Sequence, residues 1–154
     1  MSELLLASAS IRRKELLEQI GVHYDSASMD IDETVLTGEL AKEYVERLAR
    51  EKAKRGAELN KKMKVLAADT TVVVEGNILE KPENEQSARQ MLKQLSASKH
   101  DVLTGIALAK WLHGEVVIES EVVITRVTFS ELSDQDIENY IKTGEPMGKA
   151  GAYG

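Results

Sequence analysis

The segment that most constrains the fold covers residues 65–75, where the sequence reads VLAADTTVVVE. Apolar and β-branched residues occupy both faces of an extended chain here, whereas a half-buried strand shows them only at every second position. A strand with two apolar faces needs cover on both of them. The segment therefore predicts a central strand of a sheet that is covered on both faces.

The rest of the chain surrounds this strand with helical and extended patterns. Apolar residues at helical spacing, bounded by capping or turn residues, predict helices at residues 11–20, 40–59, 86–95 and 133–142. Short apolar runs predict strands at residues 4–7, 22–27, 78–80, 102–110 and 116–129, with turns at Gly76-Asn77 and His113-Gly114. At 154 residues the chain has the length of one domain. The expected architecture is an α/β domain with a mixed central sheet flanked by helices.

The first helix and the end of the chain have patterns of their own. The helix at residues 11–20 carries an apolar stripe formed by Ile11, Leu16, Leu17 and Ile20, and Gly21 is its expected end. After the last helix, the glycine-rich residues 143–154 are expected to form no regular structure by themselves.

Charge and composition exclude several classes of protein. The longest apolar stretches are far too short to cross a bilayer, and a formal net charge of -6 does not provide the basic face that nucleic-acid binding needs. No signal-peptide pattern precedes the first strand, and the absence of cysteine fits a reducing compartment. We therefore expect a cytoplasmic protein that has neither a membrane nor a nucleic acid as its partner.

The first strand ends in the motif SAS, and Arg12 and Arg13 follow in the first turn of a helix. Hydroxyl groups such as that of Ser8, together with free N–H groups at a helix start, suit an anion and phosphate above all. Two guanidinium groups add planar forks that match phosphate oxygens. The same residues equally fit a capped surface helix, with Ser10 as its N-cap and both arginines in solvent.

Asp69 interrupts the apolar central strand with a carboxylate, which costs free energy unless it is paired, hydrogen-bonded or bound to a metal. It is either a strand-end residue at the solvent rim or a catalytic base or metal ligand, and its apolar surroundings favour the second interpretation. Lys52 follows Leu48 by four residues and so lies on the buried stripe of its helix. Its ammonium either extends to solvent or points into a cleft where a negative group lies.

Lys81 and Glu33 are further candidates for the same site. Lys81 lies at the end of the strand that returns from the glycine turn. A two-residue loop places it on the sheet face of Thr70 and a three-residue loop on the face of Asp69, and the sequence leaves both open. Glu33, in the acidic motif DIDET, is either solvated or an oxygen ligand for Mg²⁺ or Mn²⁺ beside a phosphate site.

Taken in order, six motifs resemble those of the Maf (septum-formation-inhibitor-like) nucleoside triphosphate pyrophosphatases: LASASIRRKELLEQIGV, DIDET, YVERLAREKA, ADTTVVVEGNILEKP, LTGIAL and TGEPMGKAGAYG. The resemblance runs from residue 4 to the last residue. It implies an α/β fold of the inosine-triphosphate-pyrophosphatase type, with two lobes around a nucleotide cleft. It also implies a hydrolase, dependent on Mg²⁺ or Mn²⁺, that splits nucleoside triphosphates into the monophosphate and pyrophosphate and cleanses the nucleotide pool.

The resemblance implies roles for individual residues. Asp69 would be the proton acceptor and, with Glu33, would lie on the metal side. Phosphate or substrate contacts would come from hydroxyl-bearing and positively charged residues, namely Ser8, Arg12, Arg13, Lys52 and Lys81. Arg12 and Thr70 match positions associated with base selection. The ADT form of the motif at Asp69 resembles the subgroup that acts on dTTP and UTP.

The chain departs from the family pattern at three places. Ile11 stands where proline is usual, and Gly148 stands where aspartate is usual. The sequence ends at Gly154, whereas the family continues with IQG, whose glutamine belongs to the substrate-selecting set, and with further strands and a helix. We therefore expect a single Maf-like domain over residues 1–154 that lacks those elements, exposes a strand edge and forms a homodimer.

Two other functions compete with this interpretation. A nucleotidyltransferase begins with a similar strand and loop, but SASIRR lacks the glycine-rich loop expected there. A non-catalytic nucleotide-binding regulator of cell division or septum formation, made inactive by the shorter chain, is the alternative to a pyrophosphatase.

Overall fold

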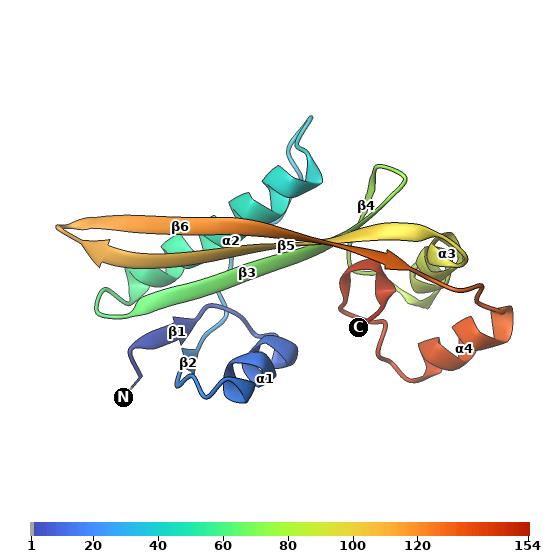
Figure 1. Cartoon of the computed structure of the whole chain (residues 1–154), viewed down its shortest axis with the longest axis horizontal. Coiled ribbons are helices and arrows are strands. Elements are labelled where there is room, and N and C mark those ends of the chain that lie inside the picture. Colours follow the sequence, from blue (N-terminus) through green and yellow to red (C-terminus); the bar gives the residue numbers. More distant parts are fainter. Residues whose placement is uncertain (1) are drawn as a thin grey trace. The chain divides into compact units, whose positions relative to one another are not determined.

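The computed structural model describes residues 2–154, which form four α-helices, one 3-10 helix and six strands (Figure 1). The helices are α1 (Ile11–Gln19), α2 (Ala41–Leu59), α3 (Glu85–Leu95), α4 (Asp134–Lys142) and the 3-10 helix η1 (Ala150–Ala152). The strands are β1 (Leu4–Leu6), β2 (Asp25–Ser26), β3 (Lys64–Val74), β4 (Asn77–Leu79), β5 (Lys99–Leu112) and β6 (Glu115–Thr128). Every expected helix and strand is present, with ends that differ by a few residues.

The strands form one mixed sheet with the order β2-β1-β3-β5-β6, and β4 pairs with β3 beside this path. β1 is parallel to both β2 and β3, whereas β3 and β4 are antiparallel. The inner position of β3 agrees with its two apolar faces. Thr71 and Val72, which are adjacent and therefore point to opposite faces, are both buried. The α/β class with a mixed sheet and flanking helices is confirmed.

The chain divides into two compact units according to its internal contacts. The resemblance implies two lobes, and the division agrees with that expectation. Unit 1 comprises Met1–Asp69 and Thr104–Val122, and unit 2 comprises Thr70–Leu103 and Val123–Gly154. The long strands β3, β5 and β6 each contribute residues to both units. Among the described residues, no helix is long and apolar enough to cross a membrane.

In unit 1, α2 lies along the sheet (Figure 1). It packs there through small side chains. Ala49, Ala53 and Ala57 repeat every four residues along α2 and are fully buried. They belong to one apolar cluster with residues of or beside β1, β3 and β5, namely Leu5, Ala7, Val65, Ala67, Ala107 and Ala109. Small residues on both sides let the helix and strand backbones come close together. Gly105 on β5 lies at such a place, because a Cβ there would be 2.3 Å from the backbone oxygen of Val45.

Gly105→Ala is therefore expected to destabilise the protein strongly, because the added methyl group would meet backbone atoms that cannot rotate away. We expect a loss of about 3 kcal/mol in the free energy of unfolding, measured by urea denaturation. Gly56→Ala is the matched control, since its Cβ would lie 2.6 Å from Val65 Cγ1, a side-chain atom that has more freedom to move. Equal losses in the two variants would contradict a backbone contact at Gly105.

In unit 2, α3 and α4 pack together through a cluster of Ala88, Leu92, Ile137, Ile141 and Ala152. The last of these belongs to η1, so three residues of the segment 143–154, which is not expected to form regular structure by itself, form a 3-10 helix within the fold. Gly151 lies against Val72, where a Cβ would come within 2.8 Å of the valine side chain. This segment gains its order from packing within unit 2, which its own sequence pattern does not reveal.

The sequence did not decide whether the α1 stripe is covered, and the hairpin turn lies one residue earlier than expected. The apolar stripe of α1 faces solvent: Ile11 is 73% exposed, Ile20 is 72% exposed, and none of the residues of α1, all of them described, is buried. A stripe is buried only when another element covers it, and periodicity alone does not supply that element. The hairpin turn comprises Glu75 and Gly76 rather than Gly76 and Asn77. Both turn residues have positive φ, 49° and 78°, as the favoured two-residue turn requires.

Candidate functional site

Lys52 of α2 lies between two carboxylates of unit 1. Its Nζ atom is 2.9 Å from Glu33 Oε1 and 3.0 Å from Asp69 Oδ1. The side chains of Lys52 and Asp69 are 13% and 14% exposed, whereas that of Glu33 is 47% exposed. One cation and two anions thus form a charged cluster, and the Glu33 side of the cluster is open to solvent.

The packing of α2 on β3 explains why Lys52 and Asp69 meet. Leu48, on the same helix stripe as Lys52, is buried, so the lysine stem runs beside the core and only its ammonium needs a polar partner. Asp69 follows the buried Ala67 by two residues on β3 and therefore points to the same face of the strand. Ala67 belongs to the cluster that includes the α2 alanines, so this face is the one that α2 covers.

Arg13 of α1 contacts the backbone next to Asp69. Its Nη1 atom donates to the Ala68 carbonyl oxygen at 2.9 Å and to Ser8 Oγ at 3.2 Å. The Ser8 hydroxyl is buried and also accepts the Ser10 N–H at 3.1 Å. The guanidinium group is therefore anchored to the backbone immediately before Asp69.

The start of α1 combines features of both alternatives that the sequence left open. Ser10 is the N-cap of α1, and its side chain accepts from the Arg13 N–H, as expected for a capped helix. The Arg12 side chain is 66% exposed and forms an ion pair with Glu15 at 3.4 Å, as expected for a surface helix. Arg13, in contrast, is turned inward. The structure therefore brings Ser8 and Arg13 to the region of Asp69 but leaves Arg12 at the surface.

Burial raises the pKa of the Asp69 carboxyl above its ordinary value, although the charges of Lys52 and Arg13 act in the opposite direction. The neighbouring Glu33 carboxylate raises this pKa further. Burial also lowers the pKa of the Arg13 guanidinium, against the effect of the same two carboxylates. Asp69 therefore takes up a proton more readily than an exposed aspartate does.

Thr70 and Lys81, two further residues that the sequence predicts for the site, belong to unit 2. The hairpin pairs Val72 with Leu79 through a two-residue loop. This register, continued outward, aligns Lys81 with Thr70, so the alternative with a three-residue loop is wrong. Lys81 itself lies beyond the end of β4 and is exposed.

Sequence reasoning missed two residues of α2 that contact the acidic segment. The Tyr44 hydroxyl donates to the Glu33 carbonyl oxygen at 2.7 Å, and Arg47 Nη2 donates to the Thr34 carbonyl oxygen at 3.0 Å. Tyr44 is one of the apolar residues at helical spacing in residues 40–59, and it is buried. A hydropathy pattern carries no information about its hydroxyl group. The three-residue spacing of Tyr44 and Arg47, which puts them on neighbouring turns of one helix side, was the available signal.

Glu33 and Asp69 are the residues that fit a divalent metal ion. Both carboxylates contact the same ammonium group, so both face one small region. Among the described residues, no group of three or more His, Cys, Asp or Glu side chains is arranged to hold a metal. Mg²⁺ is commonly bound through one or two carboxylates, with phosphate and water completing its shell. This donor set therefore fits a metal ion that is shared with a phosphate ligand.

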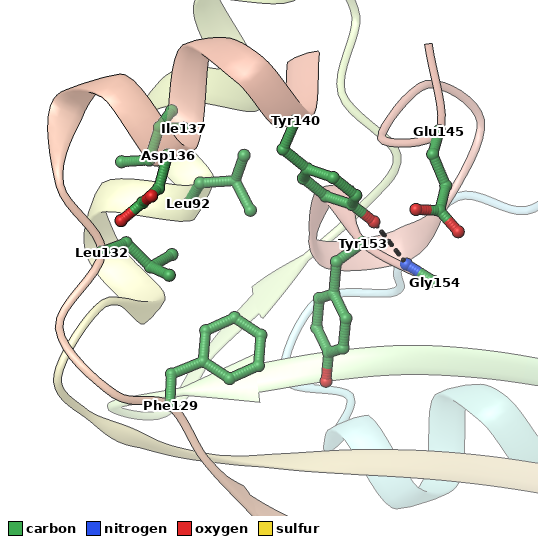
Figure 2. A pocket seen from close by; sticks show the side chains of 9 residues that line it. All are labelled: Leu92, Phe129, Leu132, Asp136, Ile137, Tyr140, Glu145, Tyr153 and Gly154. Carbon is green, nitrogen blue, oxygen red and sulfur yellow. Dashed lines mark hydrogen bonds between the residues drawn. The ribbon is translucent and has the colours of Figure 1, made fainter. Parts of the chain in front are cut away.

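Unit 2 contains a pocket of about 290 Å³ (Figure 2). It is lined by Leu92, Phe129, Leu132, Asp136, Ile137, Tyr140, Glu145, Tyr153 and Gly154. Figure 2 shows the three aromatic rings among these side chains, and the Gly154 N–H donates to the Tyr140 hydroxyl at 3.1 Å. None of the residues that the sequence predicts for a site lines this pocket.

Comparison with known proteins places this chain in a family. The family model described as Maf-like protein matches residues 3–154. A dTTP/UTP pyrophosphatase from Halalkalibacterium halodurans is 50% identical over 100% of this chain and 79% of that protein. A dTTP/UTP pyrophosphatase from Escherichia coli (strain K12) is 47% identical over 100% of this chain and 77% of that protein. The structure of the Staphylococcus aureus Ham1 protein has a similar fold, with a TM-score of 0.53 and 16% identity over 82% of this chain and 72% of that one. On the family match and the identity along its whole length, the chain belongs to the Maf family.

Proposed function

We propose that this protein hydrolyses dTTP and UTP to the nucleoside monophosphate and pyrophosphate, as a house-cleaning enzyme of the nucleotide pool. Relatives that are 47% and 50% identical carry the name of this activity. The observation that carries the proposal is the charged cluster, in which the Lys52 ammonium lies within 3.0 Å of both Glu33 and Asp69. Hydrolysis of a triphosphate needs cations that hold the phosphates and a base that activates water, and this cluster contains both.

Arg13 and Lys52 are the cations that we assign to the triphosphate. Arg13 is held by the Ala68 carbonyl oxygen and by Ser8, so its fork is oriented before a ligand arrives. The N–H groups at the start of α1 add a positive helix end. Phosphate contact by Lys81 and base selection by Arg12 and Thr70 are also proposed, and these three roles rest on the family motifs alone.

Asp69 is the residue that we assign as the proton acceptor. Its carboxylate takes a proton from water while the water oxygen forms a bond to the α-phosphorus. The bond between the α-phosphorus and the oxygen that bridges to the β-phosphorus breaks, and pyrophosphate leaves with the electron pair. The raised pKa makes Asp69 a stronger base than an exposed aspartate.

Glu33 and Asp69 would hold Mg²⁺ or Mn²⁺ on the acidic side of the cluster. When bound, the ion neutralises phosphate charge and orients the triphosphate. Lys52 contacts one oxygen of each carboxylate and keeps the two acidic groups together.

Release of pyrophosphate from dTTP, UTP and CTP, with Mg²⁺ or Mn²⁺, tests the proposal. We expect turnover of dTTP and UTP to exceed that of CTP, and EDTA to abolish it. A protein that binds these nucleotides without releasing pyrophosphate would instead support the non-catalytic regulator of septum formation.

Arg13→Lys is expected to raise the KM for dTTP at least tenfold. Lysine keeps the charge but has a single nitrogen, so it cannot bind Ala68 and Ser8 through one nitrogen and offer a second one to a phosphate, as the arginine fork can. Hydrogen bonds to charged groups contribute about 1.5–3 kcal/mol. Steady-state kinetics measure the change. Arg55→Lys is the matched control, because Arg55 lies on α2, is exposed and has no role in the proposed site. Equal increases in KM in the two variants would contradict the assignment of Arg13 to the triphosphate.

Homodimer formation and a cytoplasmic location stay predictions. The order β2-β1-β3-β5-β6 ends in two outer strands, and on one of them, β6, the Val123 and Ile124 side chains are half exposed. An outer strand with apolar side chains favours pairing with a second copy. Size-exclusion chromatography with light scattering tests this, since a dimer has twice the monomer mass of 17.0 kDa.

A further inference from the structure

The segment that carries Glu33 is tied to α2 at both of its ends. The Tyr44 hydroxyl donates to the Glu33 carbonyl oxygen at 2.7 Å. Arg47 Nη2 donates to the Thr34 carbonyl oxygen at 3.0 Å. The same guanidinium group donates from Nε and Nη2 to the two carboxylate oxygens of Glu39, at 2.6 Å and 2.9 Å. Two residues of one helix therefore hold residues 33–39.

Hydrogen bonds within the segment make it a compact turn. The Thr34 N–H and hydroxyl both donate to Asp32 Oδ1, at 2.9 Å and 2.6 Å. The Leu36 N–H donates to Glu39 Oε1 at 3.1 Å, and the Glu39 N–H donates to the Leu36 carbonyl oxygen at 3.0 Å. The Glu39 side chain is nearly buried, and Arg47 is its ion-pair partner. Arg47 therefore acts on the turn as a whole through Glu39.

α2 carries both these residues and Lys52. Tyr44 and Arg47 precede Lys52 by about two turns and one turn of the same helix, which fixes their separations along its axis. The backbone of Glu33 is therefore held beside the turn of α2 that precedes Lys52. Because the Glu33 side chain is half exposed, packing around that side chain does not by itself fix its position.

We propose that Tyr44 and Arg47 are positioning residues that keep the Glu33 carboxylate against Lys52. Their effect on turnover rests on the proposed function, in which Glu33 serves the metal side of the site. Their effect on residues 33–39 rests on the contacts alone. Neither residue touches the reacting atoms in this assignment, and both act through the main chain of the acidic segment.

Tyr44→Phe isolates this role, because it removes one oxygen atom and keeps the buried ring. The kcat/KM for dTTP is expected to fall about threefold to tenfold, which is the effect of one neutral hydrogen bond. In a Glu33→Gln background the same change should lower kcat/KM less than twofold, since no carboxylate is left to position. If Tyr44→Phe lowers kcat/KM by the same factor in the wild type and in Glu33→Gln, the inference is overturned, because Tyr44 then acts independently of Glu33.

Amide hydrogen exchange in the nucleotide-free protein needs no turnover and so separates this inference from the proposed function. Exchange at residues 33–40 should become faster in Tyr44→Phe and in Arg47→Lys, with the amides of α2 unchanged. Arg50→Gln is the matched control, since Arg50 also lies on α2 but donates to Ser120 Oγ of β6 at 2.8 Å. Unchanged exchange at residues 33–40 overturns the inference in any case. Faster exchange together with an inactive wild type supports the positioning role and refutes the pyrophosphatase.

Discussion

Asp69→Asn is expected to lower kcat by about 10²- to 10⁴-fold while the affinity for nucleotide is largely retained. The amide has the size and shape of the carboxylate and keeps one oxygen acceptor, but it has no negative charge and cannot take up a proton from water. The loss should therefore fall on the chemical step and not on the bound ground state. Pyrophosphate release measures kcat, and titration with a non-hydrolysable dTTP analogue measures affinity. A variant that retains most of its turnover would show that Asp69 is not the base.

The pH profile of kcat/KM provides a second test of Asp69. Burial raises the pKa of this carboxyl, and only its ionised form accepts a proton. Activity should therefore decrease as the pH falls through this raised pKa, at a higher pH than an exposed aspartate would give. The residual activity of Asp69→Asn should lack this acid limb. An acid limb at the same pH in the variant would assign it to another group.

The same substitution is expected to stabilise the fold at neutral pH. Because the folded-state pKa of Asp69 is raised above its unfolded value, the stability that this group contributes is present at low pH and is lost as the pH rises through the folded pKa. The ionised carboxylate therefore opposes folding at pH 7, and asparagine removes its charge. Lys52 keeps Glu33 as its partner. The Tm of Asp69→Asn should exceed that of the wild type at pH 7 and approach it in acid. A lower Tm at pH 7 would show that the Lys52 ion pair outweighs the burial of the charge.

Lys52→Met is expected to lower the free energy of unfolding by about 3 kcal/mol at neutral pH, since it leaves two carboxylates without the cation between them. Methionine retains the length of the stem, so the core beside α2 stays filled. In the wild type Lys52 lowers the pKa of Asp69, so this pKa should rise further in the variant. The loss of stability should therefore be smaller at pH 5 than at pH 8.

Urea denaturation at the two pH values measures the effect of Lys52→Met. Lys54→Met is the matched control, because Lys54 lies two residues further along α2 and is exposed. The control should change stability by less than about 0.5 kcal/mol at either pH. A loss in Lys52→Met that matches the control and does not vary with pH would contradict the charged cluster.

The helices and strands of this protein could largely be predicted from the sequence, because local patterns act over a few residues. The capping box at Ser133 and Asp136 begins α4, and the apolar repeat along residues 41–59 defines the buried side of α2. What a local pattern does not decide is what packs against it. The stripe of α1 has the same kind of periodicity as α2 but is largely exposed, and η1 forms where Gly151 lies against Val72 and Ala152 joins the cluster of α3 and α4.

For the candidate site, the sequence identified individual residues but not the contacts between them. Lys52 and Asp69 could be singled out from the sequence, because each places a charge in an apolar pattern that opposes it. That they contact each other, across 17 residues of chain, follows only from the packing of α2 on β3. The separation of Arg13 from Arg12 likewise depends on which side of α1 meets the Ala68 backbone. Periodicity assigns a residue to a side of its own helix or strand, whereas a contact between elements depends on how closely their backbones approach, and that distance is set by packing across the whole unit.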